Sequence, residues 1–346
     1  MAGVEGFEPS HSRTKTCWLN HLPTPQQKTN LSDFLDKSDA KIIYAKQKWG
    51  FFFGKYYFCP MFKPTEIIFI PTTQCNLHCE HCYVSRNNAE YNINFALDFI
   101  DDCAENGIDR ISFSGGEPFL NSDFVCKICE KAVEKEMFFG NLMTNGVWWN
   151  NEIELEEKLN LLADSGFDGK IAVSFDKFHN QDVEKITKFI EVVQKTFQYD
   201  NSLGFVCVRD GNDEKTNEML KNFKNISVDW IDYIPQDFND EEFWQCSKWL
   251  KDDFCKGPGN IFYVHNNGDI ACCCGYANEE KELILGNIAK DKFSNLMQNA
   301  KENEFIKIVY ESGFEKEIAK LEKTGKICGK TDKHCLFCRK FIELRR

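Results

Sequence analysis

The sequence has no long hydrophobic run. Its most aromatic stretch, Trp49 to Phe62, is broken by Gly54, Lys55 and Pro60, whereas a membrane-spanning helix needs about 20 consecutive apolar residues. We therefore expect no membrane span. The N-terminus also lacks the basic, then apolar, then small-residue order of a secretory signal, which favours a cytoplasmic protein.

A surplus of positive charge is also missing. The chain has 42 Lys and Arg against 54 Asp and Glu, which gives a formal net charge of −12. Broad electrostatic binding to nucleic acid is therefore not expected, because such binding needs clustered positive charge. A local basic groove for one structured RNA remains an alternative.

Apolar residues and cysteine are abundant. The 346 residues include 31 Phe and are 42% hydrophobic, which suffices for a sizeable core in one large domain with an appendage, or in two ordinary domains. The 17 Cys would suggest disulfides in a secreted protein. Without a secretory signal, reduced thiols that serve metal clusters are the better interpretation.

Three of these thiols are crowded into one short loop. Cys75, Cys79 and Cys82 are separated by three and then two residues, directly after the β-prone run Thr65–Thr72. Thiolates are soft ligands that suit zinc, copper(I) or an iron–sulfur cluster. The spacing differs from the paired C-x2-C knuckles of structural zinc sites. Three ligands with no fourth in the loop would leave one metal position for another group.

From Thr65 the chain alternates strand-like and helical segments. Amphipathic segments with capping residues and terminal glycines separate the strands, as expected for consecutive βα units. Such units imply a parallel sheet, either open or curled into a barrel. The strand-like segments are Glu66–Pro71, Asp109–Phe113, Phe139–Met143, Lys170–Phe175, Leu203–Val208 and Val228–Ile234.

Polar motifs follow the first four strands. The cysteine loop comes first, then Ser114–Pro118, then Thr144–Gly146, and then Ser174–Asp176. In a curled sheet the carboxyl ends of the strands face one mouth, where barrel enzymes keep their sites. Taken singly, the motifs have simpler interpretations as glycine turns or a helix N-cap. His179 is interpreted as a surface or packing residue.

A second cysteine group follows an acidic, Trp-containing linker. Between its first two members, Ile261–Val264 and Ile270–Cys272 flank the turn Asn266–Asp269, which predicts a β-hairpin. A zinc ribbon and a second cluster are equally compatible with the spacing. Cys255, Cys273, Cys335 and Cys338 are the most economical ligand set; Cys328 is an alternative ligand, and Cys272 or Cys274 an alternative to Cys273.

The region from Thr65 to about Ile234 resembles the core of the radical S-adenosylmethionine superfamily, a partial (β/α)6 TIM-like barrel. The resemblance implies that Cys75, Cys79 and Cys82 hold three irons of a 4Fe–4S cluster, whose fourth iron binds S-adenosylmethionine. Gly115, Gly116 and Glu117 would orient the amino group of that cofactor. The remaining contacts implied by the resemblance, to ribose, carboxylate or adenine, are Thr144, Asn145, Ser174, Asp176, His81 and Tyr83.

The pattern C-x12-G-x4-C from Cys255 to Cys273 resembles the SPASM/Twitch extensions of the same superfamily, a small Cys-rich α+β unit. This resemblance favours one auxiliary 4Fe–4S cluster over zinc. We expect residues 1–40 to be a disordered tail or an over-extended gene start, and residues 41–64 to form an aromatic β-hairpin. Residues 65–235 would form the barrel core, residues 236–254 a linker and residues 255–346 the auxiliary iron–sulfur domain.

The function implied is reductive cleavage of S-adenosylmethionine to a 5′-deoxyadenosyl radical that abstracts hydrogen from a substrate. A peptide or protein substrate, as for the maturases with such tails, is preferred to a carbohydrate-like alcohol or another small molecule. An electron donor such as flavodoxin or ferredoxin is also implied. Two alternatives remain, a zinc-stabilised binding protein and an RNA-modifying radical enzyme.

Overall fold

A computed structural model of the chain describes residues 62–250, 255, 261–327 and 329–346. The expected tail over residues 1–40 and most of the aromatic hairpin over residues 41–64 lie outside the described residues. No helix in the described ranges is long and apolar enough to cross a membrane.

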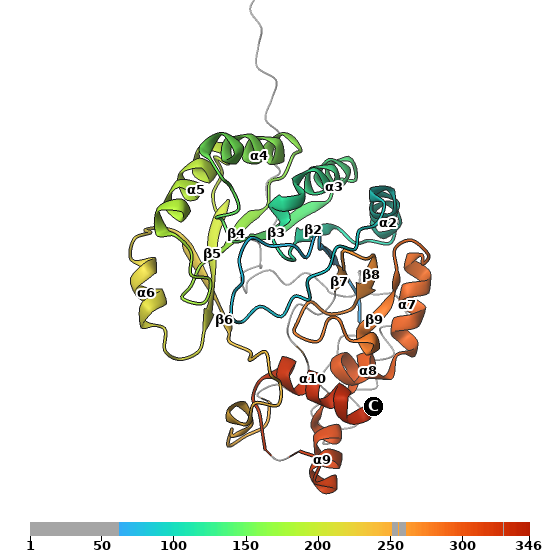
Figure 1. Ribbon diagram of the computed structural model, residues 1–346. Coiled ribbons are helices and arrows are strands. Elements are labelled where there is room, and N and C mark those ends of the chain that lie inside the picture. Colours follow the sequence, from blue (N-terminus) through green and yellow to red (C-terminus); the bar gives the residue numbers. More distant parts are fainter. Residues whose placement is uncertain (1–61, 251–254, 256–260, 328) are drawn as a thin grey trace, which may run out of the picture. The chain divides into compact units, whose positions relative to one another are not determined.

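The barrel core contains the six strands that the sequence predicts, with an α-helix after each of the first five. The strands run parallel in the order β6-β5-β4-β3-β2-β1, each beside its sequence neighbour, and the helices lie on the outer side of the curved sheet (Figure 1). The elements are β1 Glu66–Phe69, α2 Ile93–Glu105, β2 Arg110–Phe113, α3 Ser122–Glu134, β3 Phe138–Thr144, α4 Glu152–Asp164, β4 Lys170–Ser174, α5 Val183–Thr196, β5 Leu203–Arg209, α6 Glu214–Leu220 and β6 Ser227–Asp232, with a short 3-10 helix, η2, at Pro118–Asn121.

Local sequence explains where these elements begin and what they bury. The side chain of Asp182 accepts a hydrogen bond from the N–H of Glu184 and so caps α5. The apolar face of that helix is buried at i, i+3, i+4 and i+7 spacing, which packs it on the sheet. Strand β5 is buried along Leu203–Val208, as expected for a parallel strand covered on both faces.

The C-terminal region extends the same sheet. Strand β7 (Ile261–Val264) pairs parallel with β1 over four residues, from Glu66 opposite Ile261 to Phe69 opposite Val264. The predicted hairpin is present, because β7 pairs antiparallel with β8 (Asp269–Ala271), which pairs with β9 (Ile284–Asn287). Strand β1 is therefore paired on both sides, by β2 and by β7.

Short helices complete the C-terminal region. They pack their apolar faces, including Leu296, Phe305 and Phe341, into the same buried core as the barrel residues. The remaining elements are η3 Glu241–Trp244, η4 Lys281–Leu283, α7 Phe293–Glu302, α8 Glu304–Lys307, the π-helix η5 Ile308–Ser312, α9 Glu315–Thr324 and α10 His334–Arg345.

Candidate active site

A cavity of about 550 Å³ lies where the carboxyl ends of the first four strands meet. The motifs that follow these strands in the sequence all contribute to its wall, as the barrel interpretation predicts. Two residues from the C-terminal region, Tyr263 and Cys274, also line it. The predicted site residues found in the wall are Cys75, Cys79, His81, Cys82, Tyr83, Gly115, Gly116, Thr144, Asn145 and Ser174.

The three loop cysteines face this cavity as half-buried thiols. Burial, together with the neighbouring Cys75 and Cys82, raises the pKa of Cys79 to about 12. Cys75 accepts hydrogen bonds from the N–H of Leu77 at 3.4 Å and from Nδ2 of Asn145 at 3.6 Å. Burial also raises the pKa of Cys75, so the thiols of Cys75 and Cys79 stay protonated unless a cationic group stabilises the thiolate form, which is what a bound metal does.

The donor set suits a group larger than one ion. Within the described ranges, no three His, Cys, Asp or Glu side chains converge closely enough to hold a single metal ion. The three thiols nevertheless share one cavity wall. Soft donors spread around a space of this size fit an iron–sulfur cluster with a further ligand beside it.

The two glycines after β2 bring that loop against the cysteine loop. Gly115 has a φ of +127°, and a Cβ on Gly116 would lie 2.2 Å from the carbonyl oxygen of Gln74. The N–H groups of Gly116 and Glu117 donate to the carbonyl oxygens of Thr72 and Gln74 at 3.0 and 2.8 Å. Any side chain at Gly116 would therefore displace the residues that lead into Cys75.

Glu117 takes a different place from the one expected. It is fully buried, and its carboxylate accepts hydrogen bonds from the N–H of Phe119, the hydroxyl of Thr144 and the N–H of Asn145, at 3.2, 2.9 and 2.7 Å. Burial raises its pKa to about 7, although these three hydrogen bonds oppose that change. The carboxylate therefore joins the loops after β2 and β3, while Gly115 and Gly116 line the cavity beside it.

Asp176 is also turned away from the cavity. It is fully buried and accepts hydrogen bonds from Phe178 N–H, Val208 N–H and Nδ1 of His179, at 2.9, 2.8 and 2.8 Å. Burial alone would raise the pKa of this carboxyl, but the hydrogen bonds from its partners outweigh it and the pKa is lowered. Ser174, two residues earlier, lines the cavity.

His179 is a wall residue that the sequence interpretation left without a role. Asp176 orients its ring toward the cavity, where it meets the His81 ring edge-on with 4.7 Å between the centroids. Burial and the nearby His179 lower the pKa of His81 to about 4, so His81 is neutral at pH 7. The one signal in the sequence was that His179 lies three positions after Asp176.

The second cysteine group forms its own small site. Cys255, Cys273, Cys335 and Cys338 line one cavity of about 30 Å³ together with apolar side chains that include Phe305. Burial raises the pKa of Cys273, Cys335 and Cys338, so these thiols also need a metal to become thiolates. This is the set of four that the sequence favoured.

The alternative ligands of this group lie elsewhere. Cys272 is fully buried in the core, and Cys274 lines the first cavity, so neither side chain lies in the wall of the second cavity. Cys328 lies outside the described residues. The place of the Cys274 thiol in the wall of the first cavity was not predicted, because the sequence does not show which way each of three consecutive cysteines points.

Comparisons with known proteins agree with this arrangement. The radical SAM superfamily model matches residues 69–216, and the model of an iron–sulfur cluster-binding domain, SPASM, matches residues 255–329. Together they match more than half of the chain.

Two curated relatives match different lengths of the chain. YydG of Bacillus subtilis (strain 168), whose name assigns it provisionally to peptide biosynthesis, is 24% identical over 74% of this chain and 83% of its own length. A probable GTP 3′,8-cyclase of Methanocaldococcus jannaschii is 34% identical, but over only 35% of this chain and 39% of its own length.

Solved structures show the same fold. Structures of anSMEcpe with bound AdoMet superpose with a TM-score of 0.55 at 18% identity, over 81% of this chain and 95% of that one. The motifs, the sheet order and both family matches lead to one assignment. The chain belongs to the radical S-adenosylmethionine superfamily, as an enzyme with a SPASM extension that uses 4Fe–4S clusters and S-adenosylmethionine.

Proposed function

We propose that this enzyme modifies a peptide or protein by removing a hydrogen atom from it at the mouth of the barrel. The observation that carries the proposal is the cavity of about 550 Å³, whose wall combines three thiols with the carboxyl ends of β1 to β4. The bound cluster and S-adenosylmethionine supply one-electron cleavage of the sulfonium and hydrogen abstraction.

The protein's own groups position these cofactors. Cys75, Cys79 and Cys82 would ligate the catalytic cluster, and the Asn145 amide would hold Cys75 in place through its hydrogen bond to the sulfur. The backbone of Gly115–Gly116 would lie against the amino acid end of S-adenosylmethionine. Glu117 and Asp176, both buried, would brace the loops that make these contacts.

Further wall residues would contact the rest of the nucleotide or the substrate. Thr144 and Ser174 offer hydroxyl groups, and His81 and Tyr83 offer planar rings. Ile231 on β6 lines the same cavity and is 50% exposed, so an apolar group of the substrate would find a partner at this side.

A second ligand set would hold the auxiliary cluster. Cys255, Cys273, Cys335 and Cys338 share the apolar cavity described above. A one-electron carrier such as flavodoxin or ferredoxin would be the external reductant.

Two of the comparisons support a peptide or protein as substrate. The matched part of YydG, a protein named for peptide biosynthesis, spans most of both chains. A structure of anSMEcpe with a bound peptide superposes with a TM-score of 0.54. A carbohydrate-like alcohol is the alternative substrate.

Anaerobic reconstitution with iron and sulfide counting tests the cofactor sites. We expect about eight irons per chain in the wild type, and about four when Cys75, Cys79 and Cys82 are all replaced by Ala. That variant should form no 5′-deoxyadenosine under strong reductant. Replacing Cys255, Cys273, Cys335 and Cys338 by Ala should also leave about four irons but retain cleavage of the nucleotide.

Cys126→Ala is the matched control, because Cys126 is a half-buried thiol outside both cysteine cavities. It should keep the full iron content and full cleavage. Colourless protein that binds zinc and never cleaves S-adenosylmethionine would contradict the proposal. Mass spectrometry after incubation with short peptides encoded beside the gene, compared with a panel of sugar alcohols, distinguishes the two substrate classes.

A further inference from the structure

One short segment of the C-terminal region touches both cysteine sites. This connecting segment, residues 275–283, follows Cys273 and Cys274 and leads into β9. Three successive turns hold it, each closed by a hydrogen bond from a backbone N–H to the carbonyl oxygen three residues earlier. The pairs are Asn278 to Gly275 at 3.0 Å, Glu280 to Ala277 at 3.0 Å and Leu283 to Glu280 at 2.8 Å. These turns brace the segment internally.

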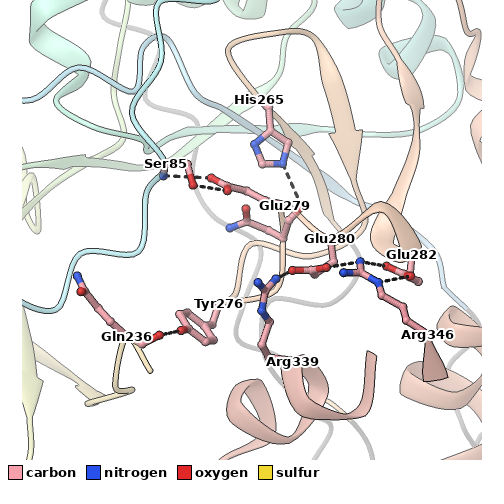
Figure 2. Close-up of polar contacts among 10 residues, drawn as sticks. Ser85, Gln236, His265, Tyr276, Glu279, Glu280, Glu282, Arg339 and Arg346 are labelled. Carbon is pink, nitrogen blue, oxygen red and sulfur yellow. Dashed lines mark hydrogen bonds and ion pairs between the residues drawn. The ribbon is translucent and has the colours of Figure 1, made fainter. Parts of the chain in front are cut away.

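Adjacent carboxylates leave this segment in different directions (Figure 2). Glu279 reaches the loop that carries the catalytic cysteines, where its two oxygens accept from the N–H and the hydroxyl of Ser85, at 3.2 and 2.6 Å. Ser85 lies three residues after Cys82. Both residues are exposed, and the pair of charge-assisted hydrogen bonds favours one position and one orientation of Ser85.

A second contact reaches the same loop. The hydroxyl of Tyr276 donates to the carbonyl oxygen of Gln236, and Nε2 of Gln236 donates to the carbonyl oxygen of Cys82 at 2.7 Å. The rings of Tyr276 and Tyr83 also meet edge-on, with 5.5 Å between their centroids. The connecting segment therefore touches the cysteine loop at its last ligand and just beyond it.

Glu280 reaches the other site. Its side chain is 7% exposed, and it is paired with the guanidinium groups of Arg339 and Arg346. Arg339 lies on α10 next to Cys338, and Cys335 lies one turn earlier on the same helix. A buried carboxylate needs such partners, because an unpaired buried charge is strongly unfavourable.

We propose that Glu279 and Glu280 are positioning residues that connect the two cysteine sites: Glu280 holds α10 so that Cys335 and Cys338 face Cys273, and Glu279 holds the catalytic cysteine loop. When the auxiliary site is assembled in this way, the loop around Cys82 and Ser85 becomes ordered as well. This inference depends on the auxiliary site assigned under the proposed function.

Three alanine variants of the connecting segment test the connection. Each is reconstituted anaerobically as the full chain, and iron is counted and amide hydrogen exchange of residues 82–88 measured. Glu280→Ala should lower the iron from about eight to about four per chain and make exchange in the loop several-fold faster. Glu279→Ala should make exchange faster without loss of iron.

Lys281→Ala is the control within the same segment. Lys281 follows Glu280 directly and is exposed, and its side chain takes no part in the contacts to Ser85, Arg339 and Arg346. Both readouts should match the wild type. If Glu280→Ala does not fold, Arg339→Lys, which keeps the charge but loses the planar fork, should show the same two changes in weaker form.

Two results would overturn the connection. One is full iron content in Glu280→Ala. The other is loss of iron in that variant without any change in exchange of the catalytic loop. A wild-type chain that takes up only about four irons would remove the auxiliary site itself, so the wild-type count distinguishes failure of the proposed function from failure of this inference.

Discussion

Glu117 is a carboxylate without contact to water, held between the loops that follow β2 and β3. Its pKa of about 7 lies above the value of 4.5 for a solvated glutamic acid because of its burial. The native protein therefore binds this proton up to about pH 7, whereas the unfolded chain releases it near pH 4.5. Between these values the unfolded chain binds fewer protons, so stability falls as the pH rises.

The substitution Glu117→Gln removes this titration while keeping the shape of the side chain. Through this titration we expect the free energy of unfolding of the wild type to fall by about 2 kcal/mol between pH 5 and pH 8. The variant should not show this loss. Thermal midpoints of the two iron-free proteins at both pH values measure the effect. Parallel pH profiles would show that the carboxyl is already ionised at pH 5 in the native protein.

Sequence reasoning predicted the thiols that line the two cavities better than it predicted the residues that support them. The cysteine trio was predictable because its spacing is contained within one loop. Glu117 and Asp176 were predicted as cofactor contacts, yet the structure buries both, with backbone N–H donors from the loop after β3 and from β5. Burial and long-range hydrogen bonds depend on the packing of distant segments, and no local motif encodes them.

At the scale of elements, the turn after β2 is packed against the start of the cysteine loop. Gly116→Ala would place a methyl group 2.2 Å from the carbonyl oxygen of Gln74 and 2.6 Å from Thr73. Both are backbone contacts, so relief requires movement of the loop at a cost of about 1–3 kcal/mol or more. We expect a lower thermal midpoint and weaker binding of S-adenosylmethionine to the reconstituted enzyme.

Gly107→Ala is the comparison for that variant. Gly107 ends the turn after α2 with a φ of +86°, and nothing lies within 4 Å of a Cβ there. Its alanine variant should lose stability through backbone strain alone and bind S-adenosylmethionine as the wild type does. Equal effects of the two variants on cofactor binding would contradict a specific role for the turn at Gly116.

The elements themselves were largely predictable. The six parallel strands and the hairpin after Val264 follow from alternating apolar runs and turn residues. The pairing of β7 with β1 could not be predicted in this way, because Glu66 and Ile261 are distant in sequence. Short apolar strands of four residues carry no signal for their partner. Only the packed core decides which strand edge they join.

For the whole molecule, that pairing makes the C-terminal region part of the barrel. A chain ending at Leu250 would leave one edge of β1 without its partner strand and remove Phe262 and Val264 from the core. We expect this truncated chain to aggregate on expression, because an exposed apolar strand edge recruits other chains. Size-exclusion chromatography measures the outcome.

The full chain with Cys255, Cys273, Cys335 and Cys338 replaced by Ala is the control. It keeps β7 and should elute mainly as a folded species even without the auxiliary cluster. A soluble, monomeric truncated chain would show that β7 is dispensable for the barrel.

The two neighbours of β1 in the sheet are synthesised at different times. Strand β1 leaves the ribosome roughly 195 residues before its second neighbour, β7, a delay of about 10–40 s at ordinary translation rates. During that interval the segment leading into Cys75 is attached to an unfinished sheet. The segment leading into Cys75 therefore gains its complete sheet only once Ile261–Val264 has been made, and a chain arrested before Ile261 should expose the free edge of β1.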